Sequence, residues 1–174
     1  MPVVLPAQLI LADEWAVALG NTTGRTEGRD PDGNVVLAVT IQHGPAALLA
    51  VEQNGVLGLL AGMELAGELK EQIARLPSSI QEKLLYTVKQ ALMECPRVAW
   101  QMQPPTVTRM GELSSLQLST FMRIERDSRE TFNRFADAIQ ELSTQLVKVN
   151  IVMGQVFAGP STGVADASHT NLYR

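Results

Sequence analysis

Apolar residues recur at steps of three and four along the last long helix that the sequence predicts, residues 128–157. This spacing keeps one face of a helix buried along its whole length. The seam carries no His, Cys or carboxylate, so it is suited to packing rather than to catalysis. The seam residues are Phe132, Phe135, Ile139, Leu142, Leu146, Val149, Met153 and Val156.

The N-terminal pattern is weaker. Apolar residues at helical spacing predict a helix over residues 7–19, and a strand over residues 8–11 is the alternative. Residues 21–33 are rich in Gly, Thr, Asp and Arg and contain almost nothing apolar, which predicts a loop.

Three strands are predicted next, over residues 34–42, Ala46–Gln53 and residues 56–61, because these segments are rich in Val, Leu and Ile. Asn54-Gly55 separates the second from the third. This dipeptide is the strongest short hairpin signal, since a type I′ turn needs positive φ at both central positions.

Helical spacing returns near Met63 and ends at Pro77. A second helix follows, with Ser79 and Glu82 in the arrangement of a capping box and Pro96 at its end. The predicted buried stripe of this helix is Ile80, Leu84, Leu85, Val88, Ala91 and Leu92.

Two further strands are indicated by alternation of apolar and polar residues over residues 97–103 and 115–125. Phe121 is the exception in the second strand, because it falls on the polar face. Asp127 or Ser128 is predicted to cap the final helix, and Glu130 completes a capping box if Asp127 is the cap.

This order of elements predicts an α+β fold, with an antiparallel sheet, helices on one face and a long C-terminal helix. Residues 1–33 are expected to form an N-terminal helix and loop, and residues 34–158 an α+β domain. Residues 159–174 are small and polar without periodicity, so a flexible tail is expected.

The amino-acid composition argues against several classes of function. The formal net charge of −4 argues against nucleic acid as a partner, since phosphate binding needs concentrated Lys and Arg. The single cysteine, Cys95, excludes an internal disulfide and fits a reducing compartment. No apolar run is long enough for a membrane span, and the N-terminus does not resemble a secretory signal. A cytoplasmic location without membrane insertion is therefore expected.

Reactive residues are sparse. His43 and His169 with one cysteine give no metal-ligand spacing, and no motif indicates a cofactor. Arg25 and Arg29 lie in a glycine-containing segment that lacks both Gly-x-Gly-x-x-Gly and the P-loop pattern. We therefore expect no metal, no cofactor and no enzymatic activity.

A family resemblance rests on four features: the Ser79-x-x-Glu82-Lys83-Leu84-Leu85 helix opening, Val98-Ala99-Trp100, Leu116-Gln117-Leu118-Ser119 and the long closing helix. With these, residues 34–157 resemble YbjN-like proteins and related small uncharacterised families that share the type III secretion chaperone-like fold. The resemblance implies an α+β domain that often dimerises and binds other polypeptides, with no established enzymatic activity and no site residues to carry over.

The favoured hypothesis is a homodimeric protein-interaction or chaperone-like module. The last turns of the long helix are more apolar than one face requires, so Ile151, Val152, Val156 and Phe157 are predicted to mediate self-association. Phe121 is the predicted contact for a protein partner.

Two alternatives stay open. One is a small-molecule-binding protein or small enzyme with a pocket near His43 and the segment of Arg25 and Arg29. The other is a structural or accessory subunit of a larger assembly.

Overall fold

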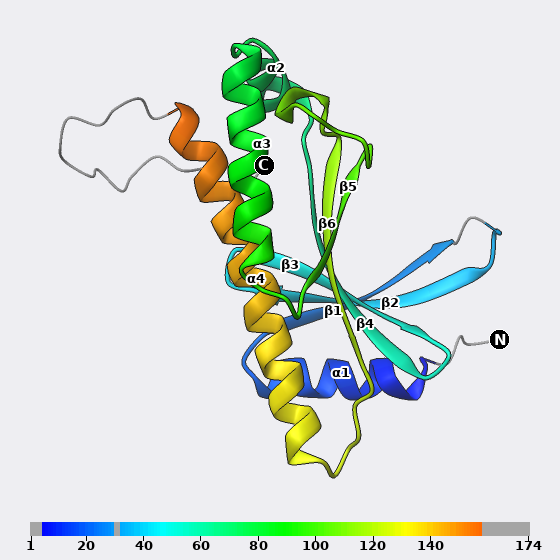
Figure 1. Ribbon diagram of the computed structural model, residues 1–174. Helices are drawn as coiled ribbons and strands as arrows, with labels where there is room; N and C mark the ends of the chain where they lie inside the picture. The colour runs from blue at the N-terminus through cyan, green and yellow to red at the C-terminus, as the bar shows by residue number, and fades with distance from the viewer. Residues whose placement is uncertain (1–4, 30–31, 158–174) are drawn as a thin grey trace.

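The computed structural model describes residues 5–29 and 32–157, which form a six-stranded antiparallel sheet with helices packed against one face (Figure 1). This confirms the predicted α+β fold and its long C-terminal helix. The elements in chain order are α1 (Ala7–Ala18), β1 (Thr22–Arg29), β2 (Val35–His43), β3 (Ala46–Gln53), β4 (Val56–Glu64), α2 (Gly67–Ala74), α3 (Ser78–Met93), β5 (Ala99–Gln103), the 3₁₀ helix η1 (Met110–Glu112), β6 (Ser115–Met122) and α4 (Arg129–Phe157).

The strand order across the sheet is β1-β2-β3-β4-β6-β5, and all neighbouring strands are antiparallel. The chain leaves β4, passes through α2 and α3 to the edge strand β5, and returns to β6 between β5 and β4. Figure 1 looks across the strands and shows how strongly their direction turns from β5 to β1. Adjacent strands ordinarily differ by roughly 20–25°, so six strands accumulate about 100–125° of twist.

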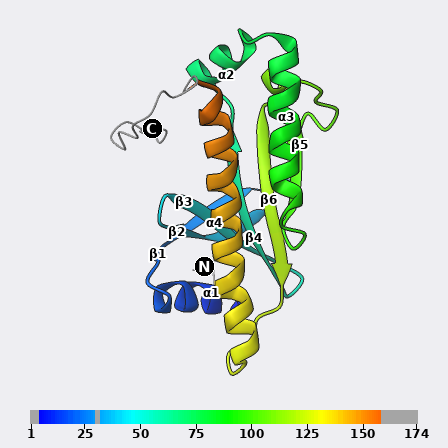
Figure 2. The same cartoon turned by 60° about the vertical axis from the view of Figure 1, so that its left-hand side comes forward.

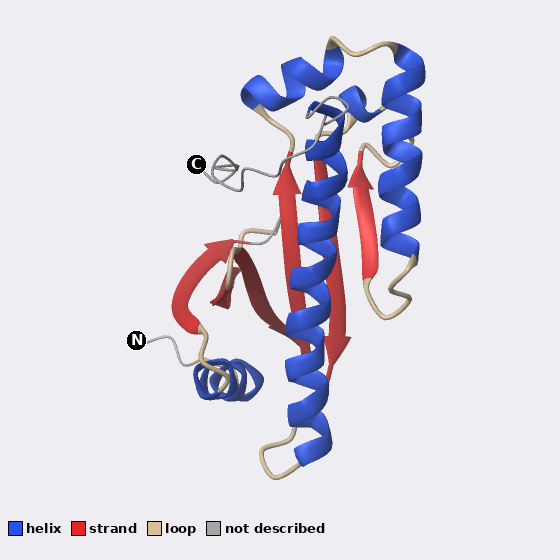
Figure 3. Ribbon diagram, turned by 90° about the vertical axis from the view of Figure 1, so that its left-hand side faces the viewer, coloured by secondary structure: helices blue, strands red, loops and turns tan. Residues whose placement is uncertain are grey.

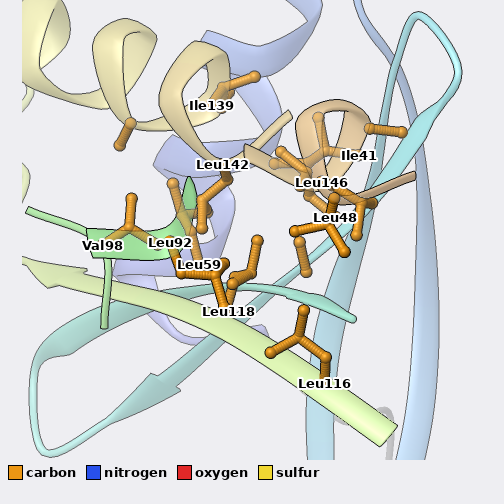
Figure 4. Packing of buried hydrophobic residues seen from close by; sticks show 14 of the residues in the cluster. Ile41, Leu48, Leu59, Leu92, Val98, Leu116, Leu118, Ile139, Leu142 and Leu146 are labelled. Carbon is orange, nitrogen blue, oxygen red and sulfur yellow. The ribbon is translucent and has the colours of Figure 1, made fainter. Parts of the chain in front are cut away.

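One face of the sheet, here called the covered face, carries the hydrophobic core. Its residues alternate along each strand and meet α1, α3 and α4 (Figure 4). Cross-strand neighbours such as Ile41 and Leu48 both lie on this face and are buried. The most deeply buried sheet residues include Val39, Ile41, Leu48, Ala50, Leu57, Leu59, Leu116 and Leu118.

Helix α4 lies along the covered face, and Figures 2 and 3 show it in front of the strands. Six of its predicted seam residues are buried, while Phe132 and Val156 are partly buried against the core, so the predicted seam is confirmed. Ser128 caps the helix, because its Oγ accepts a hydrogen bond from the Thr131 backbone N–H at 3.2 Å. The box that required Asp127 as the cap is therefore not formed.

Helix α1 is predicted correctly, and the strand alternative over residues 8–11 is wrong. The side chain of Gln8 replaces a strand neighbour at Ile124: its Nε2 donates to the Ile124 carbonyl at 2.9 Å, and its Oε1 accepts from the Ile124 N–H at 3.0 Å. Trp15 packs edge-on against Phe132 and Phe135, with ring centroids 5.2 and 5.8 Å apart. These contacts join α1 to α4 and to the end of β6.

The loop predicted over residues 21–33 is wrong, because Thr22–Arg29 forms the edge strand β1. It pairs with β2 through eight residues of continuous register, from Thr22 opposite Gln42 to Arg29 opposite Val35. All but one of its residues are exposed, so it has no apolar alternation that a sequence pattern could reveal. Residues 7–29 thus share the sheet and core of residues 34–157, while the predicted tail, residues 159–174, lies outside the described residues.

Several boundaries differ from the prediction around the next helices. Strand β4 continues to Glu64, and the helical tract begins only at Gly67. Helix α3 begins at Ser78 after Pro77, with no side-chain cap, so the capping box of Ser79 and Glu82 is wrong. Ile80 was predicted in the buried stripe but is 40% exposed.

The last two strands are shorter than predicted. β5 begins at Ala99 rather than at residue 97, and β6 ends at Met122 rather than at residue 125. The predicted hairpin is confirmed, with positive φ at both Asn54 (54°) and Gly55 (76°). Because β5 is the shorter of the two neighbours of β6, residues 120–122 pair with β4 on one side and have no strand on the β5 side.

Candidate functional site

The unpaired part of β6 borders a groove. Strand β5 pairs with β6 only from Ser115 to Ser119, whereas β4 pairs with β6 as far as Met122. Figure 3 shows the strand nearest α3 beginning partway along its neighbour. Successive residues of a strand direct their N–H and C=O groups to alternate sides, so at least one residue of 120–122 presents both groups to the side that β5 does not reach.

The groove beside this edge, here called the edge groove, has a volume of about 460 Å³. β6 forms one wall and α4 the other, with Arg97 from the chain before β5 at one end. Its lining residues are Arg97, Thr120, Phe121, Met122, Arg134, Asp137, Ala138 and Glu141.

The rim of the edge groove carries charges of both signs. Arg97 and Glu141 form an ion pair across it at 3.4 Å, and both side chains reach solvent. Such an exposed pair contributes only about 0–1 kcal/mol, so it can open at little cost. Arg134 and Asp137 are exposed beside it. Met122 and Ala138 are buried, so the groove combines an apolar floor with a charged rim.

Phe121 lies where the edge groove meets the uncovered face of the sheet. It is 61% exposed, which agrees with its predicted place on the polar face of the strand. Its ring packs over Gly58, the residue opposite it on β4, and a Cβ on Gly58 would lie only 2.9 Å from Phe121 Cε1. An aromatic ring that covers a cross-strand glycine replaces the packing that the glycine lacks.

The end of α4 is the other surface that the sequence singles out. Ile151 is 54% exposed and Phe157 is 39% exposed, whereas Val152 and Val156 are partly buried against the core. Because α4 lies on the covered face, these residues and Phe121 lie on opposite sides of the sheet. The structure therefore does not join the five predicted partner-binding residues into one surface.

The alternative pocket near His43 is not formed by the residues that suggested it. His43 contacts Asn21 Oδ1 through Nδ1 at 2.7 Å and Gln140 Oε1 through Nε2 at 3.2 Å, so it joins β2 to α4 and to the start of β1. Arg25 pairs with Asp13 at 3.4 Å, and Arg29 donates to the Gly33 carbonyl at 2.7 Å.

These arginines also lie away from His43 along the strands. Arg25 is opposite Val39, four residues from His43, which is about 13 Å along a strand. Three cavities among the described residues, of about 460, 370 and 550 Å³, are not lined by His43, Arg25 or Arg29, although the last of them is bordered by Gln42 and Pro45, near His43 in the chain.

Two shifted pKa values have structural causes. The pKa of Glu112 is lowered mainly because its carboxylate accepts hydrogen bonds from the backbone N–H groups of Thr108 and Arg109. The pKa of Arg126 is raised by its contact with Glu14, 2.7 Å away on α1. Neither group lines the edge groove.

Two further features bear on ligands. Among residues 5–29 and 32–157, no three His, Cys, Asp or Glu side chains gather in a way that could hold a metal ion. None of the described helices is both long enough and apolar enough to cross a bilayer.

Sequence analysis identified Phe121 but missed the other residues of the edge groove. Arg134, Asp137 and Glu141 look like ordinary solvent-facing positions of α4, since the buried seam falls elsewhere. One signal was available, because the predicted strand over residues 97–103 is shorter than that over residues 115–125. Which end of β6 extends beyond β5 depends on the register of the two strands, and the register is known only from the fold.

Comparisons with known proteins support the fold. No protein-family model matches the chain, and no curated protein matches it. The chain is similar in structure to an uncharacterised protein from Methanothermobacter thermautotrophicus, with a TM-score of 0.66, 12% identity, and coverage of 86% of this chain and 99% of that one.

YbjN from E. coli, a proposed transcription regulator, is also matched, with a TM-score of 0.45, 13% identity, and coverage of 90% of this chain and 95% of YbjN.

Proposed function

We propose that the protein is a non-enzymatic protein-interaction module that binds an extended segment of a partner polypeptide in the edge groove. The observation that supports this proposal is the unpaired stretch of β6, residues 120–122, which faces a groove of about 460 Å³. An extended peptide can add to such a free edge as a strand, in line with β5 and antiparallel to β6.

Each part of the edge groove has a role in this mode of binding. The N–H and C=O groups of β6 provide affinity that does not depend on the partner's sequence. Met122, Ala138 and Phe121 offer apolar contact to alternate side chains of the peptide, because successive side chains of a strand point to opposite faces. Arg134 and Asp137 offer partners to charged side chains of either sign.

A library of random ten-residue peptides displayed on phage tests this proposal. The wild-type chain is expected to enrich peptides with apolar residues at alternate positions. In Ala138→Leu, three additional carbons occupy the floor of the groove, and affinity for the enriched peptides is expected to fall at least tenfold. Hydrogen exchange of the amides of residues 120–122 should slow when peptide binds.

Ala136→Leu is the matched control. It makes the same change on the same helix at a partly buried position that does not line the groove. Failure to enrich any peptide would contradict the proposal, as would equal losses of affinity in the two variants.

An accessory subunit of a larger complex would use the same groove, and it would differ only in holding its partner permanently. Self-association through Ile151, Val152, Val156 and Phe157 at the end of α4 stays a prediction from the sequence, and it competes with self-association through the sheet.

A further inference from the structure

The face of the sheet opposite the helices, here called the open face, is almost free of charge. The strand register shows which residues of the six strands lie on the open face, because cross-strand partners point to the same side of the sheet. These residues are Thr22, Gly24, Thr26 and Gly28 on β1; Val36, Ala38, Thr40 and Gln42 on β2; Ala47, Leu49, Val51 and Gln53 on β3; Val56, Gly58, Leu60, Gly62 and Glu64 on β4; Ser115, Gln117, Ser119 and Phe121 on β6; and Ala99, Gln101 and Gln103 on β5. Among these described residues only Glu64, at the end of β4, is charged.

Strand β1 shows that this distribution is not a consequence of burial. Its residues are exposed on both sides of the sheet, so charge could lie on either. Arg25, Glu27 and Arg29 all point to the side of α1, and Thr and Gly residues occupy the open face. Typical soluble domains contain about 25% charged residues, and this chain contains 18%. Removing water from a charge is costly unless it is paired, so a face whose only charge is Glu64 costs less to dehydrate than a charged face, provided that its Thr, Ser and Gln side chains keep hydrogen-bond partners.

The centre of the open face combines a projection with a hollow. Phe121 projects from β6 opposite Gly58. Further along the same pair of strands, Gly62 lies opposite Gln117, and a hollow of about 370 Å³ lies there, bordered also by Leu49 and Leu60. Phe121 and this hollow are four residues apart, which is about 13 Å along the strands.

We propose that the open face is the surface on which a second copy of this chain packs, sheet against sheet. The two-fold axis would run across the strands at the level of Leu60 and Ser119, midway between Phe121 and the hollow. Rotation about that axis places Phe121 of each copy over the hollow at Gly62 of the other. A two-fold interface of this kind must be complementary to itself.

The residues along the axis fit this arrangement. Register aligns one residue from every strand in a row across the sheet, and each meets its own counterpart in the other copy. The row is Gly24, Thr40, Leu49, Leu60, Ser119 and Ala99. It is apolar at its centre and contains no charge, so no like charges meet at the axis.

The shape and size of the open face also suit a second copy. A uniformly twisted sheet coincides with its own shape after a two-fold rotation about an in-plane axis across its strands, so two copies can stay in contact outward from the centre. Six strands spaced by about 4.8 Å and about eight residues long present a face of roughly 700 Å². Stable interfaces bury about 800 Å² per partner, so this face is of the required size.

Light scattering on the full chain tests the proposal at tens of micromolar protein. The wild-type chain is expected at twice its mass of 18.9 kDa. Ser119→Arg brings two guanidinium groups together at the axis and is expected to give a folded monomer with an unchanged circular dichroism spectrum. Ile151→Arg introduces the same residue at the exposed end of α4 and is expected to remain a dimer.

A second measurement keeps the test decisive if Ser119→Arg does not fold. Ser119→Cys in a Cys95→Ser background places the only thiol of each copy at the axis, and mild oxidation is expected to give a covalent dimer. Ile151→Cys in the same background is expected to cross-link far less.

A wild-type monomer would overturn the proposal, and so would dissociation by Ile151→Arg in place of Ser119→Arg. Cross-linking through residue 151 rather than residue 119 would do the same. The proposal shares Phe121 with the edge groove but is tested at residues that do not line that groove. Because Ala138→Leu is tested by peptide affinity and Ser119→Arg by mass, failure of one proposal can be distinguished from failure of the other.

Discussion

The two faces of the sheet are built from the same strands but differ in burial and in composition. On the covered face, Leu48, Leu59 and Leu118 are buried beneath α4 and the other helices. On the open face, the neighbouring residues Leu49 and Leu60 are only partly buried, and Phe121 is largely exposed. The covered face shows what folding of one chain requires. The open face has few charges although water reaches it, which indicates that folding of one chain does not account for its composition.

Adjacent leucines of β4 provide the sharpest test of this difference. Leu59→Ala removes a fully buried side chain from the covered face and is expected to lower the free energy of unfolding by about 2–5 kcal/mol. Leu60→Ala removes a partly exposed side chain from the open face and is expected to lower it by about 1 kcal/mol. Urea unfolding followed by circular dichroism measures both at one protein concentration, since self-association adds to apparent stability. Equal losses would show that both faces contribute equally to the fold of one chain.

Hydrogen-bonding glutamines extend the comparison to polar contacts. Gln8→Ala removes two partly buried bonds to the backbone of Ile124, and a loss of about 1–3 kcal/mol is expected. Gln42→Ala, on the open face, removes one exposed bond to the Gly44 carbonyl, for which a loss below about 1 kcal/mol is expected. Urea midpoints of the two variants measure the difference, and a larger loss in Gln42→Ala would contradict the interpretation.

The packing of Phe121 on Gly58 predicts a small but coupled effect. Phe121→Ser is expected to lower the free energy of unfolding by about 0.2–1 kcal/mol, the range for a cross-strand pair. Gly58→Ala should be unfavourable beside the ring, because its Cβ would lie 2.9 Å from Phe121 Cε1. Once Phe121 is serine, the same change should become less unfavourable, since only the contact with Val51 Cγ2 at 3.2 Å remains and alanine loses less conformational entropy than glycine in a strand. Thermal midpoints of the two single variants and the double variant test this, and additive effects would contradict it.

Glu112, which lies on neither face of the sheet, is expected to have the smallest effect on stability. Its pKa is lowered in the folded chain from a value of 4.5, so its contribution is present above the unfolded pKa and lost as the pH falls through the folded pKa. Glu112→Gln is therefore expected to be less stable than wild type near neutral pH. The two proteins should converge in acid, as thermal midpoints measured from about pH 7 to about pH 3 would show. A difference that persists at the lowest pH would mean that the charge of Glu112 is not its cause.

Sequence pattern predicted the elements that bury their own apolar face. The seam of α4, the stripe of Leu84, Leu85 and Val88 on α3, and the Asn54-Gly55 hairpin all follow from local periodicity or turn chemistry. The sequence pattern gave wrong predictions where contacts with other segments of the chain determine the local structure. β1 has no apolar alternation, because its stabilisation comes from pairing with β2 and it buries almost nothing. The predicted capping box at Ser79 is wrong because the helix begins one residue earlier, at Ser78 directly after Pro77.

By itself, the sequence determined the α+β fold and the long helix, and it showed that Phe121 stands apart from the core pattern, because periods of two and 3.6 residues are local properties of the backbone. Tertiary structure alone decided which residues share a surface. The edge groove exists because β5 pairs with only five residues of β6, and the uncharged open face is visible only once register aligns alternate residues of six strands. Register depends on contacts between residues far apart in the chain, and a single sequence does not state those contacts.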